Sequence, residues 1–117
     1  SSRFTESKIF TDLIEELPIT REATTSRVVV NNEVLRFLLF SFDAGQVLTE
    51  HSSTRAVIVQ LLSGKMEFTV GDTTAILSAG DVVYLAPDDR HALTALEPCH
   101  MALTMVDMNS EPIKNRD

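Results

Sequence analysis

The chain has 117 residues, of which 17 are acidic and 10 basic, and its formal net charge is −7. This length suits one compact domain, and an acidic chain without clustered Lys and Arg is a poor partner for nucleic acid or an anionic membrane. Cys99 is the single cysteine, so no intramolecular disulfide can form. No apolar stretch approaches the roughly 20 residues of a membrane span, so we expect a soluble, cytoplasmic protein.

The first 26 residues differ in pattern from the rest of the chain. Apolar residues recur at helical spacing, and Pro18 follows where a helix has to end. The pattern predicts one short helix over about residues 7–17, joined to the following domain by a polar connection over residues 18–26. The residues that carry this spacing are Ile9, Phe10, Leu13, Ile14 and Leu17.

From Arg27 onward, short apolar runs alternate with turn residues, a pattern typical of strands. The run Val34–Phe42 is apolar on both faces apart from Arg36 and Ser41, which predicts cover on both sides, by the barrel interior and by another sheet or subunit. The run Lys65–Val70 alternates strictly, with Met66 and Phe68 among its inward residues. Further strands are expected over residues 28–30, 55–62, 74–77, 82–86, 91–96 and 101–107. An all-β barrel or sandwich over residues 27–108 follows, with a polar tail over 109–117.

Two segments of this β-rich part carry a spaced set of glycines and histidines. In DAGQVLTEHSSTRAVIVQLLSG, five residues separate Gly45 from His51, and Gly64 ends the next strand; in GDVVYLAPDDRHAL, His91 lies eleven residues after Gly80. These segments resemble the two motifs of the cupin superfamily, G-x5-H-x-H-x3,4-E-x6-G and G-x5-P-x-G-x2-H-x3-N. The resemblance covers about residues 34–106. It implies an RmlC-like jelly-roll β-barrel, and in many members a homodimer, which the doubly apolar strand also favours.

The resemblance also implies a metal site, from which this sequence departs. Metal-binding cupins use two histidines and a glutamate from the first motif and a histidine from the second. Here His51 and His91 keep two of these positions, whereas Ser53 and Val57 stand at the other two and Ala95 replaces the final Asn. Imidazole and carboxylate ligands suit Fe, Mn, Ni, Zn or Cu, but stable sites supply three or four ligands. Whether the barrel holds a divalent transition metal or none stays open; the replacement ligands we consider are Glu50, Gln60, His100 and bound water.

The same positions predict a ligand pocket framed by His51, Ser53 and His91. Arg55 has the strand parity of Ser53 and Val57, so either it faces the pocket and pairs with an anionic ligand or it lies at the surface. Tyr84 either places its hydroxyl in the pocket or belongs to the core. The remaining candidates are apolar lining or core: Val57, Met66, Phe68, Met101 and Met105. Cys99 and His100 are neighbours on a strand and face opposite ways, which favours a structural role for both.

Three functions are compatible with this pattern. The first is a small-molecule binding protein without catalysis. The second is a metal-dependent dioxygenase or isomerase that uses His51 and His91. The third, which we rank last, is a metal-free epimerase with a histidine base, because the sequence shows no acidic partner for such a base.

Overall fold

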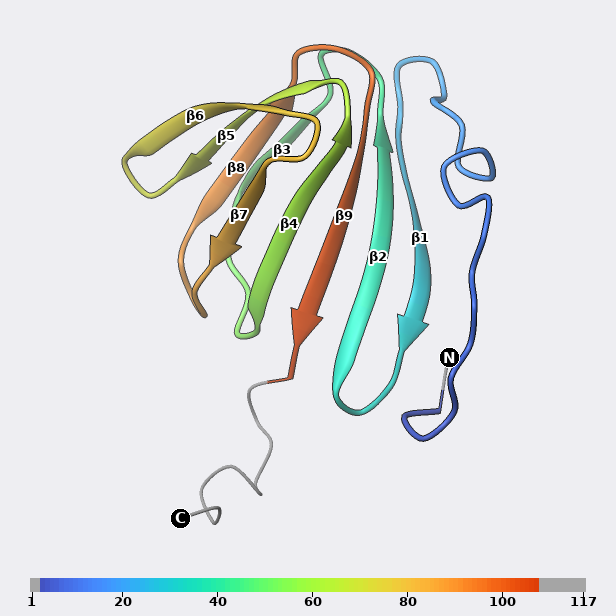
Figure 1. Cartoon of the computed structure of the whole chain (residues 1–117). Helices are drawn as coiled ribbons and strands as arrows, with labels where there is room; N and C mark the ends of the chain where they lie inside the picture. Colours follow the sequence, from blue (N-terminus) through green and yellow to red (C-terminus); the bar gives the residue numbers. More distant parts are fainter. Residues whose placement is uncertain (1–2, 108–117) are drawn as a thin grey trace.

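A computed structural model describes residues 3–107 of the chain, and this part contains nine antiparallel strands and no helix (Figure 1). No helix in it is long and apolar enough to cross a membrane. The predicted tail over residues 109–117 lies outside the described part. The strands are β1 (Thr24–Asn31), β2 (Leu35–Phe42), β3 (Val47–His51), β4 (Ala56–Ser63), β5 (Lys65–Val70), β6 (Thr73–Ser78), β7 (Val82–Leu85), β8 (His91–Ala95) and β9 (Cys99–Val106).

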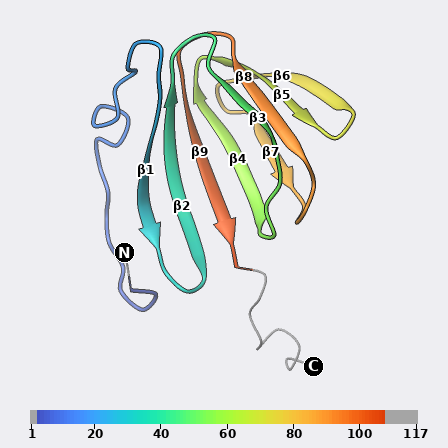
Figure 2. The same ribbon diagram turned by 180° about the vertical axis from the view of Figure 1, so that it is seen from behind.

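The strands form two sheets that face each other (Figures 1 and 2). The larger sheet has the order β1-β2-β9-β4-β7 and the smaller one the order β3-β8-β5-β6. The predicted all-β, cupin-type fold is confirmed, and its barrel is not closed. The edge strands of one sheet do not pair with those of the other within residues 3–107, so the structure is an open sandwich of two twisted sheets.

The core lies between the sheets and follows the alternation of side chains along each strand. On β5 the predicted inward residues Met66 and Phe68 are buried, with 0% and 3% of their surface exposed. Pairing of β2, β9 and β4 aligns their inward side chains in rows across the larger sheet. One row contains Phe40, Met101 and Leu61, and a second contains Leu38, Leu103 and Val59. These rows form the floor of the space between the sheets.

The predicted helix over residues 7–17 is wrong. The chain makes a turn over residues 13–16, with hydrogen bonds from the Glu16 N–H to the Asp12 carbonyl at 3.0 Å and from the Leu17 N–H to the Ile14 carbonyl at 3.1 Å. Asp12 has a left-handed φ of 59°, which interrupts any helix through it. A single turn does not recover the cost of helix nucleation. Ile9 is 88% exposed, so the apolar residues of the segment do not share one buried face.

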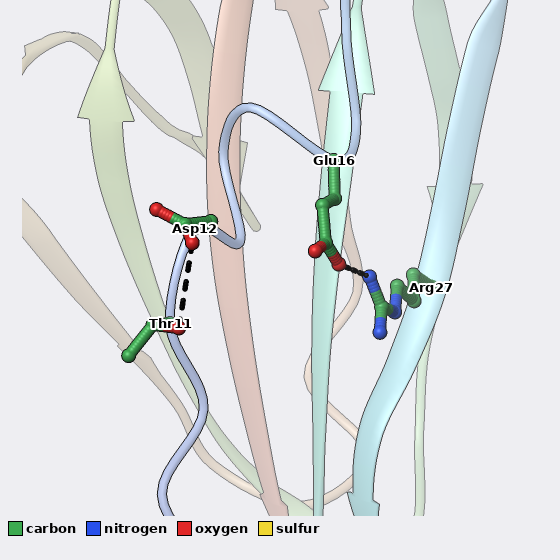
Figure 3. Close-up of polar contacts among 4 residues, drawn as sticks. All are labelled: Thr11, Asp12, Glu16 and Arg27. Carbon is green, nitrogen blue, oxygen red and sulfur yellow. Dashed lines mark hydrogen bonds and ion pairs between the residues drawn. The ribbon is translucent and has the colours of Figure 1, made fainter.

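This N-terminal segment instead covers the outer face of the larger sheet. Leu17 packs in a buried cluster with Leu39 of β2 and Ala102 of β9. His100, on the outer face of β9, donates from Nε2–H to the Leu17 carbonyl at 2.7 Å and fixes the segment in place. Figure 3 shows the ion pair at its end, where a carboxylate oxygen of Glu16 lies 2.6 Å from Nη1 of Arg27 on β1.

The cover explains why β2 is apolar on both faces. Its inner face borders the core and its outer face contacts the chain's own N-terminal segment, through Phe37 and Leu39. The strand therefore does not require a second subunit to bury its outer side. The homodimer stays a prediction that rests on the family resemblance.

At the turn between β4 and β5 the backbone closely approaches the connection from β8 to β9. Gly64 has a φ of 82° and lies against the segment that leads into β9. A Cβ at this position would lie 2.6 Å from the Cβ of Cys99 and would also clash with the Pro98 carbonyl oxygen. Only glycine fits here, since both the backbone angle and the space exclude a side chain.

We expect Gly64→Ala to lower the free energy of unfolding by about 3 to 5 kcal/mol, because left-handed strain and overpacking add. Gly45→Ala is the matched control, since Gly45 has a φ of 87° but nothing within 4 Å of its Cβ position. This control should cost about 1 to 2 kcal/mol from strain alone. Urea denaturation of both variants measures the difference, and equal losses would show that the close approach does not matter.

Candidate functional site

A pocket of about 360 Å³ opens between the two sheets. Its walls are mainly apolar and come from the inner faces of β2, β4 and β9 on one side and of β3, β5 and β8 on the other. Polar side chains lie at the mouth, where β3 ends and β8 begins. The lining residues are Arg36, Leu38, Phe40, Leu48, His51, Ser52, Ser53, Val57, Val59, Phe68, His91, Leu93, Met101, Leu103 and Met105.

The two motif histidines meet across adjacent strands. His51 at the end of β3 is the pairing partner of His91 at the start of β8, and their ring centroids are 4.0 Å apart at an angle of 60°. Phe68 lies parallel to the His91 ring, with centroids 6.1 Å apart. The structure therefore brings His51 and His91 together on one wall of the pocket, with Ser53 also among the lining residues.

Backbone carbonyls fix the tautomer of both rings. Nδ1 of His51 lies 2.8 Å from the Thr49 carbonyl oxygen, and Nδ1 of His91 lies 3.3 Å from the Asp89 carbonyl oxygen. A carbonyl only accepts hydrogen bonds, so each Nδ1 carries the proton and donates it. In the neutral form of each ring, Nε2 is left with a free lone pair. The pair therefore offers two hydrogen-bond acceptors, or two metal-ligating nitrogens.

Burial makes His91 a weaker base than usual. Only 7% of its surface is exposed, and loss of hydration lowers its pKa below the ordinary value of 6.5. The hydrogen bond to the Asp89 carbonyl acts in the opposite direction, and the neighbouring His51 lowers the pKa further. His91 is therefore neutral at pH 7 and can accept a hydrogen bond through Nε2.

The residues at the pocket do not fit a transition-metal site. His51 and His91 supply two nitrogens, but Ser53 and Val57 occupy the positions where the family resemblance implies a further histidine and a glutamate. Among residues 3–107, no group of three or more His, Cys, Asp or Glu side chains is arranged to hold a metal ion. Two imidazoles fall short of the three or four ligands of a stable site.

The replacement ligands considered from sequence lie elsewhere. Glu50 forms an exposed ion pair with Arg90, with a carboxylate oxygen 2.9 Å from Nη2. Gln60 faces away from the pocket, where it borders the N-terminal segment. His100 uses both ring nitrogens on the outer face of β9, since Nδ1 pairs with the Ser63 hydroxyl at 3.2 Å and Nε2–H donates to Leu17.

Three other candidates also lie away from the lining. Tyr84 is on the outward side of β7 and is 62% exposed, and Met66 is fully buried in the core. Arg55 is not among the residues that line the pocket. Its expected orientation assumed that side chains alternate without interruption from β3 to β4. Residues 52–55 belong to no strand, so alternation does not extend from His51 to Arg55.

Arg36 is a site residue that the sequence analysis did not identify. It appeared only as a polar interruption in an apolar strand, but its position on the inner face of β2 places it in the pocket lining. The signal was present in the alternation: Arg36, Leu38, Phe40 and Phe42 share one parity, and Leu38 and Phe40 also line the pocket.

Cys99 is a structural residue. Its side chain is fully buried in the core between the sheets, and burial raises the pKa of the thiol to about 11. The thiol is therefore protonated at neutral pH and is a poor nucleophile. Its neighbour His100 faces the other side of β9, as strand alternation predicts.

Comparison with known proteins identifies the family and the fold. The Cupin domain family matches residues 38–107, more than half of the chain. A conserved protein of unknown function from Streptococcus pyogenes is 31% identical, with similarity covering 90% of this chain and 92% of that one and a TM-score of 0.80. No protein of curated function matches the sequence.

More distant structures agree with this fold. A cupin superfamily protein from Desulfitobacterium hafniense has a TM-score of 0.78 at 18% identity, over 86% of this chain and 93% of that one. An RmlC-like cupin from Desulfovibrio desulfuricans has a TM-score of 0.76 at 22% identity, over 86% of this chain and 97% of its own. Identities this low establish a shared fold and no shared activity.

We expect the pKa of His91 to lie below 6.5 in an NMR titration and to rise in His51→Ala, because removal of His51 relieves charge repulsion and admits water. The depressed pKa also makes stability depend on pH. Below pH 6.5 the unfolded chain binds a proton more readily than the folded one, so the free energy of unfolding should fall as the pH drops from 7 toward the folded pKa.

Urea denaturation between pH 7.5 and 5.5 measures this loss, and His91→Gln should reduce it. A pKa of His91 at or above its ordinary value would contradict the burial seen in the structure.

Proposed function

The chain belongs to the cupin family, and we propose that it binds a small, largely apolar molecule in the pocket between its two sheets. The observation that carries this proposal is the pocket itself. Its volume of about 360 Å³ lies in the usual range for small-molecule sites, and its walls are apolar apart from a few polar groups near the mouth. Such walls favour a ligand with an apolar body, and the Nε2 atoms of His51 and His91 add acceptors for a polar end.

The enzymatic alternatives have less support from the site. The two free Nε2 atoms are the one feature that favours a metal-dependent dioxygenase or isomerase, but the pocket adds neither a carboxylate nor a third imidazole to them. An epimerase base would need an acidic partner, whereas both Nδ1–H groups donate to backbone carbonyls.

Elemental analysis of untagged protein, beside His51→Ala and His91→Ala, separates these cases. Stoichiometric metal lost in both variants would favour the enzyme.

Methionine methyl groups report directly on the pocket. Met101 and Met105 line it, whereas Met66 is as deeply buried as Met101 but does not line the pocket, so it serves as an internal reference. We expect 1-hexanol to shift the 13C-methyl NMR signals of the two lining methionines and to leave that of Met66 nearly unchanged. Five buried CH₂ groups at about 0.8 kcal/mol each contribute about 4 kcal/mol, which corresponds to a Kd of about 1 mM.

A variant that fills the pocket provides the control. Leu103 lies in the middle of the floor, so Leu103→Trp should weaken hexanol binding at least about tenfold, which is a loss of about 1.4 kcal/mol. Ile58→Trp adds the same side chain on the outer face of β4, where Ile58 is 47% exposed, and should change nothing. The proposal fails if hexanol leaves both lining methyls unshifted, or if it binds equally well to Leu103→Trp.

A further inference from the structure

Arg36 lies on the inner face of β2 and lines the pocket, and within residues 3–107 no ion pair joins it to a carboxylate. Its Nε atom is buried, and no hydrogen-bond acceptor in residues 3–107 contacts it. Two other arginines of the described part form ion pairs, Arg27 with Glu16 and Arg90 with Glu50. A buried N–H donor without an acceptor among the described residues is costly to the fold, so Arg36 is a candidate for an acceptor supplied by a ligand.

The pocket offers no negative charge to balance Arg36. Its lining contains no aspartate or glutamate among the residues that the structure describes, although 17 of the 117 residues are acidic. The other ionisable groups that line it are His51 and His91, which are either neutral or positive. The pocket is therefore a local positive region within an acidic protein.

Strand pairing places Arg36 in the same row as Val57, a position where the family motif has a metal ligand and this chain does not. Arg36 and Val57 are the register partners of Met105 on its two sides, so all three side chains form one inward row across β2, β9 and β4. Adjacent strands are about 4.8 Å apart, which puts the Cα atoms of Arg36 and Val57 about 10 Å from each other. Val57 stands at the position of the family's glutamate ligand. The row thus holds a cation and no acid.

We propose that the ligand is a small monocarboxylate with an apolar body, whose carboxylate pairs with the guanidinium of Arg36. The guanidinium is a planar fork of N–H donors that matches the two oxygens of a carboxylate. The apolar body then contacts Met101, Leu103 and Leu93. One fixed cation balances one negative charge, so a monoanion fits better than a phosphate dianion. This inference rests on the proposed binding function and adds the chemical class of the ligand.

The test compares two probes of equal chain length, hexanoate and 1-hexanol, at pH 7.5, where hexanoate is ionised. Binding is followed by the methyl signals of Met101 and Met105. We expect hexanoate to bind wild-type protein at least about tenfold more tightly than hexanol. In Arg36→Met the ratio of the two dissociation constants should fall to about one, and in Arg36→Lys it should be intermediate, because lysine keeps the charge and lacks the fork.

Arg55→Met is the matched control, since it removes the same charge from a residue outside the lining. It should keep the full preference for hexanoate. If hexanol binds but hexanoate binds no better, or if Arg36→Met keeps the preference, the carboxylate assignment is wrong and the binding function stands. If neither probe shifts the lining methyls, both proposals are wrong.

The stability of Arg36→Met separates a ligand-binding role from a structural one. Because Nε of Arg36 is buried without a partner in the part of the chain that the structure describes, a methionine of similar length should not lower the thermal midpoint of the ligand-free protein and should raise it by a few degrees. A midpoint lowered by more than a few degrees would show that Arg36 supports the fold through contacts of its own, which would overturn the assignment.

Discussion

The structure depends on one point of contact, where the β4–β5 turn meets the connection from β8 to β9. Gly64 lies against Pro98 and Cys99 too closely for any side chain, and the N–H groups of Leu96 and Glu97 both donate to the Lys65 carbonyl, at 2.9 and 3.3 Å. Four connections between the sheets lie at this end, drawn at the top of Figure 1, whereas two lie at the other end, over residues 52–55 and 86–90. The sandwich is therefore tightly closed at one end, and its pocket opens toward the end with fewer crossings.

The chemistry of the pocket follows from this asymmetry. The two connections at the open end are joined by a hydrogen bond from the Asp88 N–H to the Ser53 carbonyl at 2.6 Å, and they border the strand ends that carry His51 and His91. Because both histidines donate Nδ1–H to local carbonyls, their rings are oriented by the backbone and not by acidic side chains. Polar groups thus lie only where the sheets separate, and the apolar rows behind them exclude water.

The sequence carried enough information for most of the sheet structure and for half of the site. Alternation correctly predicted the buried face of β5 and the opposite orientations of Cys99 and His100, because each lies within an uninterrupted strand. It could not decide between the two positions considered for Arg55, because residues 52–55 leave the strand and parity is lost there. The apolar residues of the N-terminal segment recur at helical spacing, which predicted a helix. The same residues can instead cover the outer face of a sheet without forming a helix, and the spacing does not distinguish the two. The strand β3 went unpredicted because it is short, its side chains are mostly exposed, and its sequence VLTEH does not alternate between apolar and polar residues.

The departures from the metal motif and the presence of Arg36 have one physical explanation. A divalent cation needs donors that carry negative charge or lone pairs, and it is repelled by a fixed positive charge in the same low-dielectric space. Val57 removes the carboxylate from the inward row that it shares with Met105 and Arg36, and Arg36 adds a guanidinium to that row. With Val57 alone, a metal in the pocket would have too few ligands. With Arg36 alone, a metal would face a fixed positive charge. Together they leave a row with one fixed positive charge and no acid, which favours an anionic ligand over a metal cation.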